Sequence, residues 1–152
     1  SFDLAGNQLR FGRVAMRNAH GSEVVDLTLP MFTETLRAGG YYSLESDDSC
    51  SMLATADLSI TDNLSSPGAS SPITIINATA VGGQINVNLP APGSGVDGNI
   101  LVTPTLQGSL DNRWLRYDWT GGAQFDDDPA ATASFGIYQG NPVQIFIEQT
   151  YQ

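Results

Sequence analysis

The chain has 152 residues, of which 41% are hydrophobic and 14% charged, a composition that suits one compact domain. It contains sixteen acidic residues and six basic ones, all of them arginine, so the formal net charge is -10. Such a chain repels a phosphate backbone, which argues against nucleic acid as a partner. No apolar run approaches the roughly 20 residues that cross a bilayer, so we expect no membrane insertion.

Alternation of apolar and polar residues dominates the chain, as it does in half-buried β-strands. It is clearest over residues 84–89, where Ile85, Val87 and Leu89 alternate with polar side chains. Over residues 52–61 it places Met52 and every second residue after it on an inward face. Strands are predicted, in chain order, over residues 8–17, 23–29, 32–37, 52–61, 73–80, 84–89, 99–106, 113–119, 131–138 and 143–147.

Turn-forming residues separate the predicted strands. Clusters of glycine, proline, serine or asparagine lie at residues 39–40, 65–68, 82–83, 90–98, 121–122 and 140–142. Short alternating strands between such turns are typical of antiparallel sandwiches and barrels. No window has a sustained helical period with caps, so we expect little helix. The sequence therefore predicts an all-β fold: a single antiparallel β-sandwich, jelly-roll or immunoglobulin-like, spanning residues 1–152.

Aspartates gather in the predicted loops. They are Asp47, Asp48, Asp111, Asp118, Asp126, Asp127 and Asp128. Calcium needs several oxygen ligands, which clustered loop carboxylates supply, and it would relieve the self-repulsion of an acidic domain. No segment has the spacing of an EF-hand loop. These residues are therefore candidate calcium ligands, and the alternative is that they cap and turn solvated loops.

Aromatic residues beside polar ones form the second candidate site. Exposed rings next to polar side chains commonly hold sugars, through apolar stacking and hydrogen bonds. The candidate ligand-binding residues are Tyr41, Tyr42, Trp114 and Arg116. Trp119 shares a predicted strand face with Leu115 and Tyr117, which places it in the core. Core packing is the alternative explanation for most of the other rings as well.

Enzymatic interpretations find little support in the sequence. His20, Ser22 and Asp26 are the residue types of a triad, but nothing predicts that they converge, and no Gly-x-Ser-x-Gly segment is present. We expect His20 in a polar surface turn. Cys50, the single cysteine, has no evident base and no internal disulfide partner. We therefore expect a protein that is not an enzyme, with a small carboxylate-dependent hydrolase as a remote alternative.

Five segments, taken in order, carry a family resemblance: FGRVAMRNAHGSE (11–23), DDSC (47–50), LPAPG (89–93), LRYDW (115–119) and ASFGIYQGN (133–141). The set resembles the C-terminal domain of unknown function of MshQ-like proteins, which are encoded with the mannose-sensitive haemagglutinin pilus, a type IV pilus. The resemblance implies the last module of a large exported bacterial surface protein, and it brings no catalytic mechanism. It also implies that Cys50 pairs with a cysteine elsewhere in the parent protein, and a buried free thiol is the alternative.

Two roles at the extracellular cell surface follow from this resemblance and from the candidate residues. In the first, the domain is an adhesion module that binds a surface glycan or calcium. In the second, it is an assembly module whose exposed strand edge, formed by residues 143–151, docks a pilus protein or another cell-surface protein.

Two expectations concern the N-terminal part of the domain. Arg13 or Arg17 is expected to form an ion pair with Glu23 or Asp26 across a hairpin. Gly12 is expected to occupy a bulge and Gly21 a turn, each with unusual backbone dihedrals.

Overall fold

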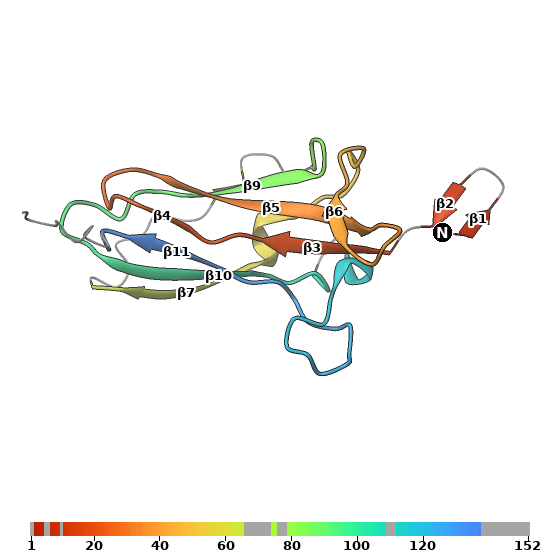
Figure 1. The fold of residues 1–152 in the computed structure, drawn as a ribbon. Coiled ribbons are helices and arrows are strands. Elements are labelled where there is room, and N and C mark those ends of the chain that lie inside the picture. The colour runs from red at the N-terminus through yellow and green to blue at the C-terminus, as the bar shows by residue number, and fades with distance from the viewer. Residues whose placement is uncertain are drawn as a thin grey trace, which may run out of the picture.

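Two β-sheets form the domain in the computed structural model (Figure 1), which describes residues 2–4, 7–9, 11–65, 74–75, 79–108 and 112–137. One sheet has the strand order β3 (Gly12–Met16), β5 (Leu27–Leu36), β9 (Gln84–Leu89) and β8 (Thr74–Ile75), with β6 (Tyr42–Leu44) paired to β5. The other has the order β4 (Ala19–Gly21), β11 (Ala131–Phe135), β10 (Gly98–Pro104) and β7 (Leu58–Leu64). A separate hairpin consists of β1 (Phe2–Leu4) and β2 (Asn7–Leu9).

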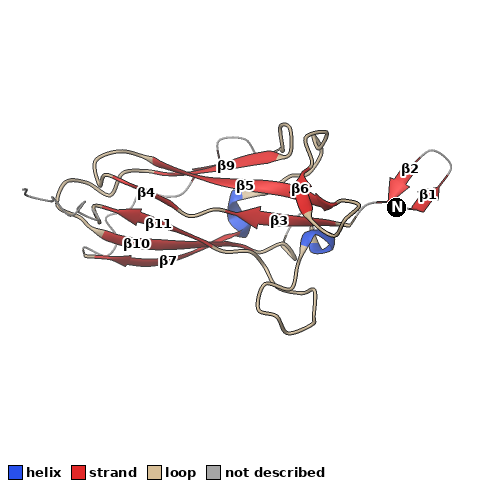
Figure 2. Ribbon diagram, viewed as in Figure 1, coloured by secondary structure: helices blue, strands red, loops and turns tan. Residues whose placement is uncertain are grey.

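The all-β sandwich prediction is confirmed. The helical segments of the described chain are two single 3-10 turns, η1 (Thr55–Asp57) and η2 (Arg113–Leu115), which are blue in Figure 2. Strand pairing is antiparallel except between β4 and β11, which run parallel. In the part of the chain that the structure describes, no helix is long and apolar enough to span a membrane.

Alternating side chains from both sheets fill the core. In β9, Ile85, Val87 and Leu89 are buried, as their period of two predicts, and Ile100 and Val102 of β10 are buried in the facing sheet. The other large core residues are Val14, Leu29, Met31, Leu53, Leu64, Leu106, Leu115 and Phe135. The period-two pattern therefore predicts the core well wherever a strand is central in its sheet.

One strand replaces the two that were predicted over residues 23–29 and 32–37. β5 continues through Pro30, a residue that usually breaks a strand because it has no N–H to donate. The Pro30 carbonyl accepts a hydrogen bond from the N–H of Arg17, just beyond the end of β3. Because the nitrogen and carbonyl of one residue point to the same side of an antiparallel strand, the Pro30 nitrogen also faces Arg17, and the ladder between β5 and β9 loses no hydrogen bond.

The strand predicted over residues 52–61 is also corrected. The chain makes the turn η1 before β7 begins at Leu58. Before this turn the predicted inward face is wrong, because Met52, expected to point inward, is 44% exposed, whereas Leu53, expected to point outward, is buried. Within β7 the predicted face is right, because Ile60 pairs with buried Val102, but β7 lies at the edge of the sheet and leaves Ile60 half exposed.

The strand predicted over residues 113–119 is wrong. Its first part is the turn η2, and only Tyr117 forms an isolated bridge, with Asp127. Leu115 is buried as expected, but Trp119 is 40% exposed and does not belong to the core. The strand predicted over residues 143–147 and the docking edge over 143–151 lie outside the described residues.

Candidate functional site: an aromatic surface pocket

Residues of β6, η2 and the start of β3 line a surface pocket of about 550 Å³. This volume is in the range of small-molecule binding sites. These three elements lie close together at one end of the sandwich in Figure 1. Five aromatic rings line it: Phe11, Tyr42, Trp114, Tyr117 and Phe125. Two arginines, Arg113 and Arg116, and the apolar Leu36 complete most of its wall. We refer to this site as the aromatic pocket.

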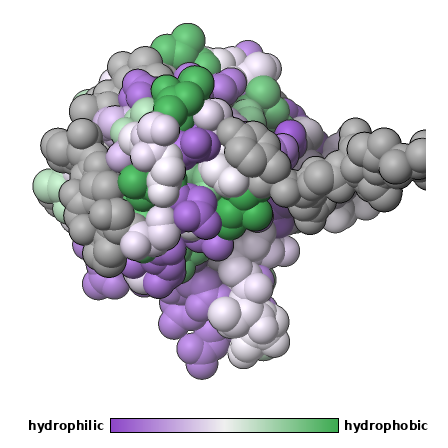
Figure 3. Space-filling model, turned by 90° about the vertical axis from the view of Figure 1, so that its left-hand side faces the viewer, coloured by the Kyte–Doolittle hydropathy of each residue, from purple (hydrophilic) through white to green (hydrophobic). Residues whose placement is uncertain are grey.

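The rings of the aromatic pocket are unusually exposed for their size. The exposed fraction is 76% for Phe11, 62% for Trp114 and 68% for Phe125. Single exposed apolar residues are ordinary, but a contiguous group of aromatic rings marks a binding surface. At the opposite end of the sandwich, by contrast, apolar residues are interspersed with polar ones (Figure 3).

Gly12 allows η2 to pack closely over β3. A Cβ atom at this position would lie 3.2 Å from Cδ2 of Leu115 and 3.4 Å from Cζ3 of Trp114. A larger side chain here would push the Trp114 ring out of its place. The expected bulge at Gly12 is wrong, because Gly12 is a regular residue of β3, paired with Thr35. The expected turn at Gly21 is wrong as well, because Gly21 lies in β4, paired with Phe135, without a positive φ.

Arg13 does not line the pocket, but its guanidinium group packs against two rings that do, those of Tyr42 and Tyr117. Its guanidinium carbon lies 3.9 Å from the ring centre of Tyr42, 4.7 Å from that of Tyr117 and 4.9 Å from that of Trp119. It also forms an ion pair with Glu34 on the neighbouring strand, with a distance of 2.8 Å. The predicted pairing with Glu23 or Asp26 is therefore wrong for Arg13, and for Arg17 it stays a prediction.

The contacts with Arg13 hold the rings of Tyr42 and Tyr117, which both line the aromatic pocket. Tyr117 makes edge-to-face contacts with Tyr42, Trp119 and Phe125, with ring centres 5.3, 5.1 and 5.6 Å apart. Burial and the neighbouring Tyr117 raise the pKa of Tyr42, so this hydroxyl stays protonated at neutral pH. The wall is thus preorganised, which lowers the entropic cost of binding.

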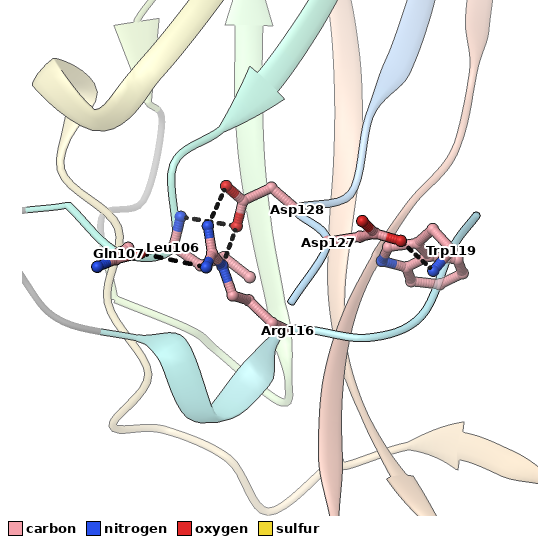
Figure 4. A network of polar contacts seen from close by, with 6 residues as sticks. All are labelled: Leu106, Gln107, Arg116, Trp119, Asp127 and Asp128. Atoms are coloured by element: carbon pink, nitrogen blue, oxygen red, sulfur yellow. Dashed lines mark hydrogen bonds and ion pairs between the residues drawn. The ribbon is translucent and has the colours of Figure 1, made fainter. Parts of the chain in front are cut away.

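Arg116 is held in a fixed plane by Asp128 (Figure 4). The two side chains form a bidentate pair of 2.9 and 3.0 Å, and Arg116 also donates to the Gln107 side chain at 3.2 Å. The hydrogen bond to Asp128 raises the pKa of Arg116 above its already high value. Asp128 in turn accepts the N–H of Leu106 at 3.2 Å, so this carboxylate has a structural role.

Asp118 and Asp127 shape the loop that carries Phe125. Asp118 accepts the N–H groups of Gly122 and Ala123, at 2.8 and 2.9 Å. Asp127 accepts both the N–H and the hydroxyl of Thr120, which lowers the pKa of Asp127, and it also accepts the N–H of Trp119 (Figure 4). Both carboxylates therefore accept hydrogen bonds within their own loop, as turn-capping residues do, and do not point toward a shared metal position.

A second, smaller hollow of about 240 Å³ adjoins the first and shares Gly12 and Trp114 with it. Its character is acidic, because Glu34, Glu45, Asp47 and Asp48 line it. Burial raises the pKa of Asp48, but hydrogen bonds outweigh this, first that from the N–H of Ser51, and they lower the pKa to about 2. Asp48 is therefore ionised at any physiological pH.

We predict a pH-dependent loss of stability for Asp48→Asn. A carboxyl group whose pKa falls from about 4 in the unfolded chain to about 2 in the folded one stabilises the folded state above pH 4, and this contribution disappears as the pH falls to 2. Because the group is partly solvated, we expect about 1 kcal/mol at pH 7. Urea unfolding should show the two proteins converging between pH 4 and pH 2, and a difference independent of pH would contradict this assignment.

The calcium hypothesis finds no cluster to support it in the described structure. Among the described residues, no three His, Cys, Asp or Glu side chains lie close enough to hold a metal ion. Asp126 is exposed, and Asp111 lies outside the described residues. Because Asp111 is not described, a calcium site that includes it stays a prediction.

The structure brings together three of the four predicted ligand-binding residues. Tyr42, Trp114 and Arg116 line the aromatic pocket, whereas Tyr41 is 60% exposed and does not line it. The other lining residues were missed, and so was the supporting Arg13; the missed lining residues are Phe11, Gly12, Leu36, Arg113, Tyr117 and Phe125. Phe125 directly precedes the aspartates at 126–128, and that neighbourhood was the one local signal for it.

Two further residues depart from expectation. His20 is exposed as predicted, but it lies in the short strand β4 rather than in a turn. Cys50 is exposed, so the buried free thiol is wrong. Its Sγ donates to Asp48 Oδ1 at 3.5 Å, and this hydrogen bond raises the pKa of Cys50, which disfavours the reactive thiolate.

The fold and the pocket together define a β-sandwich domain with an aromatic surface pocket. The family model described as DUF6701, fourth domain, matches residues 10–149, which is 140 of the 152 residues. The chain therefore belongs to the family of DUF6701 fourth domains. Neither the curated proteins nor the solved structures gave a significant match.

Proposed function

We propose that this domain is a non-enzymatic binding module of a bacterial cell-surface protein and that it holds a glycan in the aromatic pocket. The observation that carries the proposal is the pocket itself, in which five rings and two guanidinium groups surround one volume of about 550 Å³. Sugar rings have apolar C–H faces that pack on aromatic rings and hydroxyls that accept hydrogen bonds from arginine.

The surface location rests on three supporting points. The chain contains no lysine and is rich in Ser, Thr, Asn and Gly, a composition typical of exported bacterial surface proteins. Its segments resemble the last domain of MshQ-like proteins, which are associated with a type IV pilus. The description of its family as a fourth domain fits a module of a larger protein.

The assembly role stays a separate proposal. It requires an exposed strand edge, and the edge predicted for it, residues 143–151, lies outside the described residues. Within the described sheet, β7 is at the edge and pairs with β10 alone, but its outward side chains are mostly small and polar. The aromatic pocket therefore supports glycan binding more directly than any described edge supports docking.

A glycan array probed with the domain tests the proposal. We expect binding to one class of bacterial or host glycan by the unmodified domain. Gly12→Val should lose at least tenfold in affinity for that class, because its side chain meets Trp114 and Leu115 and displaces the ring from the wall.

The exposed Tyr41→Ala, outside the pocket, is the matched control and should bind normally. Thermal melting of each variant must show a folded protein. Absence of any array signal, or an equal loss in Gly12→Val and Tyr41→Ala, would reject the aromatic pocket as the glycan site.

A further inference from the structure

Negative charge collects beside the aromatic pocket, in the smaller hollow of about 240 Å³ that shares Gly12 and Trp114 with it. We refer to this second cavity as the acidic hollow. None of its described lining residues is basic, and four of them carry a carboxylate: Glu34, Glu45, Asp47 and Asp48. The two cavities are therefore neighbouring compartments of different chemistry, and the ring of Trp114 belongs to both.

Two of the four carboxylates in the acidic hollow already have a cation. Glu34 is paired with Arg13 at 2.8 Å, and Glu45 is paired with Arg37 at 3.6 Å. The other two carboxylates form no ion pair within the part of the chain that the structure describes. Four carboxylates less two ion pairs leave the wall of the acidic hollow with two uncompensated negative charges.

Asp48 is one of these two charges, and neutral groups keep it ionised. Burial raises the pKa of Asp48, but hydrogen bonds from the N–H groups of Ser51 and Cys50, at 3.0 and 3.1 Å, outweigh this, and the pKa is about 2. The hydrogen bond from Cys50 to Asp48, and then the charge of Asp48, raise the pKa of the Cys50 thiol, which lines the same hollow. This wall therefore disfavours an anion and favours a cation.

Asp47 is the carboxylate that a ligand can reach. It is exposed, whereas the side chains of Glu34 and Glu45 are only 15% and 13% exposed. Trp114 is exposed beside it in the same wall, and the face of an indole ring attracts cations. A cavity lined by an aromatic ring and by uncompensated carboxylates is complementary to an organic ammonium group, which has N–H donors for the carboxylate oxygens.

We infer that the glycan bound by this domain contains amino sugars, one of which packs on Trp114 and places its protonated amine in the acidic hollow, beside Asp47 and Asp48. This inference rests on the proposed glycan-binding function and specifies the class of glycan. The aromatic pocket holds the adjoining sugar units of the same ligand.

Isothermal titration with three trimers of the same linkage tests the inference. They differ in one group on each glucose unit, which is an amine in the glucosamine trimer, an acetamide in the N-acetylglucosamine trimer and a hydroxyl in cellotriose. At about pH 5.5 the amines are protonated, and Asp48, with a pKa of about 2, is ionised. We expect the glucosamine trimer to bind at least about tenfold more tightly than either neutral trimer.

Asp47→Ser tests whether the acidic hollow is the source of this preference. The substitution removes an exposed carboxylate and should reduce the preference over cellotriose to about threefold or less. Asp97→Ser is the matched control, because Asp97 is also exposed but lines neither cavity. It removes the same charge from the chain and should leave the preference within about twofold. Thermal melting must show that both variants are folded.

Ionic strength gives a second readout. Between about 0.1 M and about 1 M salt the Debye length falls from about 10 Å to about 3 Å. Affinity for the glucosamine trimer should therefore decrease over this range, and affinity for cellotriose should change little. A preference for the amine that is the same at both salt concentrations would contradict a charge-based site.

The outcomes separate the two proposals. Equal binding of the glucosamine trimer and cellotriose, or an array whose best ligands contain no free amine, overturns the inference and leaves glycan binding in place. Binding of trilysine as tight as that of the glucosamine trimer would show that charge alone is recognised, which also overturns it. Failure of every glycan, both in this titration and on the array, rejects the proposed function itself.

Discussion

Replacing Trp114 by alanine is expected to weaken glycan binding about 30-fold. The ring is 62% exposed, and a sugar packed on it would cover roughly 80 Å² of apolar surface, worth about 2 kcal/mol. The loss should be in affinity and not in stability, because little of this side chain is buried in the folded domain. Titration of the variant with the best glycan from the array measures the loss.

Tyr41→Ala is again the control for the Trp114 variant. Both residues are exposed aromatics, but only Trp114 lines the aromatic pocket. The control should bind within twofold of the unmodified domain. A Trp114→Ala protein that binds the glycan as well as this control does would mean that the pocket is not the binding site.

The second large effect concerns stability and is expected for Arg13→Ala. The substitution removes the ion pair with Glu34, in which the two side chains are only 19% and 15% exposed, and it removes three ring contacts at once. We expect a loss of about 3 kcal/mol, from broken cation–π contacts, lost packing and a mostly buried carboxylate without its cation. The melting temperature should fall by about 6 to 12 °C.

Arg17→Ala is the matched control for Arg13. Arg17 is exposed and lies over a single ring, that of Phe32, at 4.9 Å. It should cost less than about 1 kcal/mol. Arg13→Lys should fall between the two, since lysine keeps the charge but loses the planar contact with the rings. Similar melting temperatures for Arg13→Ala and Arg17→Ala would show that the cluster around Arg13 does not stabilise the domain.

Much of the fold follows from the sequence because period-two patterns report burial directly. Residues 84–89 are the clearest example, since every apolar position there is buried. The pattern fails where tertiary contacts outweigh it. Residues 113–119 alternate like a strand, yet this segment begins with the turn η2. The ion pair between Arg116 and Asp128 holds the segment against the loop that precedes β11. A contact across twelve residues between two loops leaves no trace in local periodicity.

The candidate site is predictable only in part, for a similar reason. Trp114 and Arg116 could be chosen because they stand together in a polar, aromatic segment. Arg13 looked like a partner for a nearby acid, whereas the register between β3 and β5 places it beside Glu34. Strand register is set by the whole sheet, so neither this ion pair nor the three surrounding rings could be assigned from sequence alone.

The clustered aspartates show the limit of composition as evidence. Asp48, Asp118 and Asp127 each accept backbone N–H groups from their own loops. Their abundance suggested calcium, but each side chain satisfies the turn in which it lies. The residues that gather around one volume are instead aromatic, and they come from four separate parts of the chain.

The most direct test of the account is the indole N–H region of the nitrogen-15 NMR spectrum during titration with the best-bound glycan from the array. The chain has two tryptophans, so two signals are expected, and Trp119→Phe assigns them. Trp114 lines the aromatic pocket and Trp119 does not. We predict that the Trp114 signal shifts and saturates as this glycan binds, while the Trp119 signal moves much less. A Trp114 signal that stays in place while binding is detected by calorimetry would contradict the account.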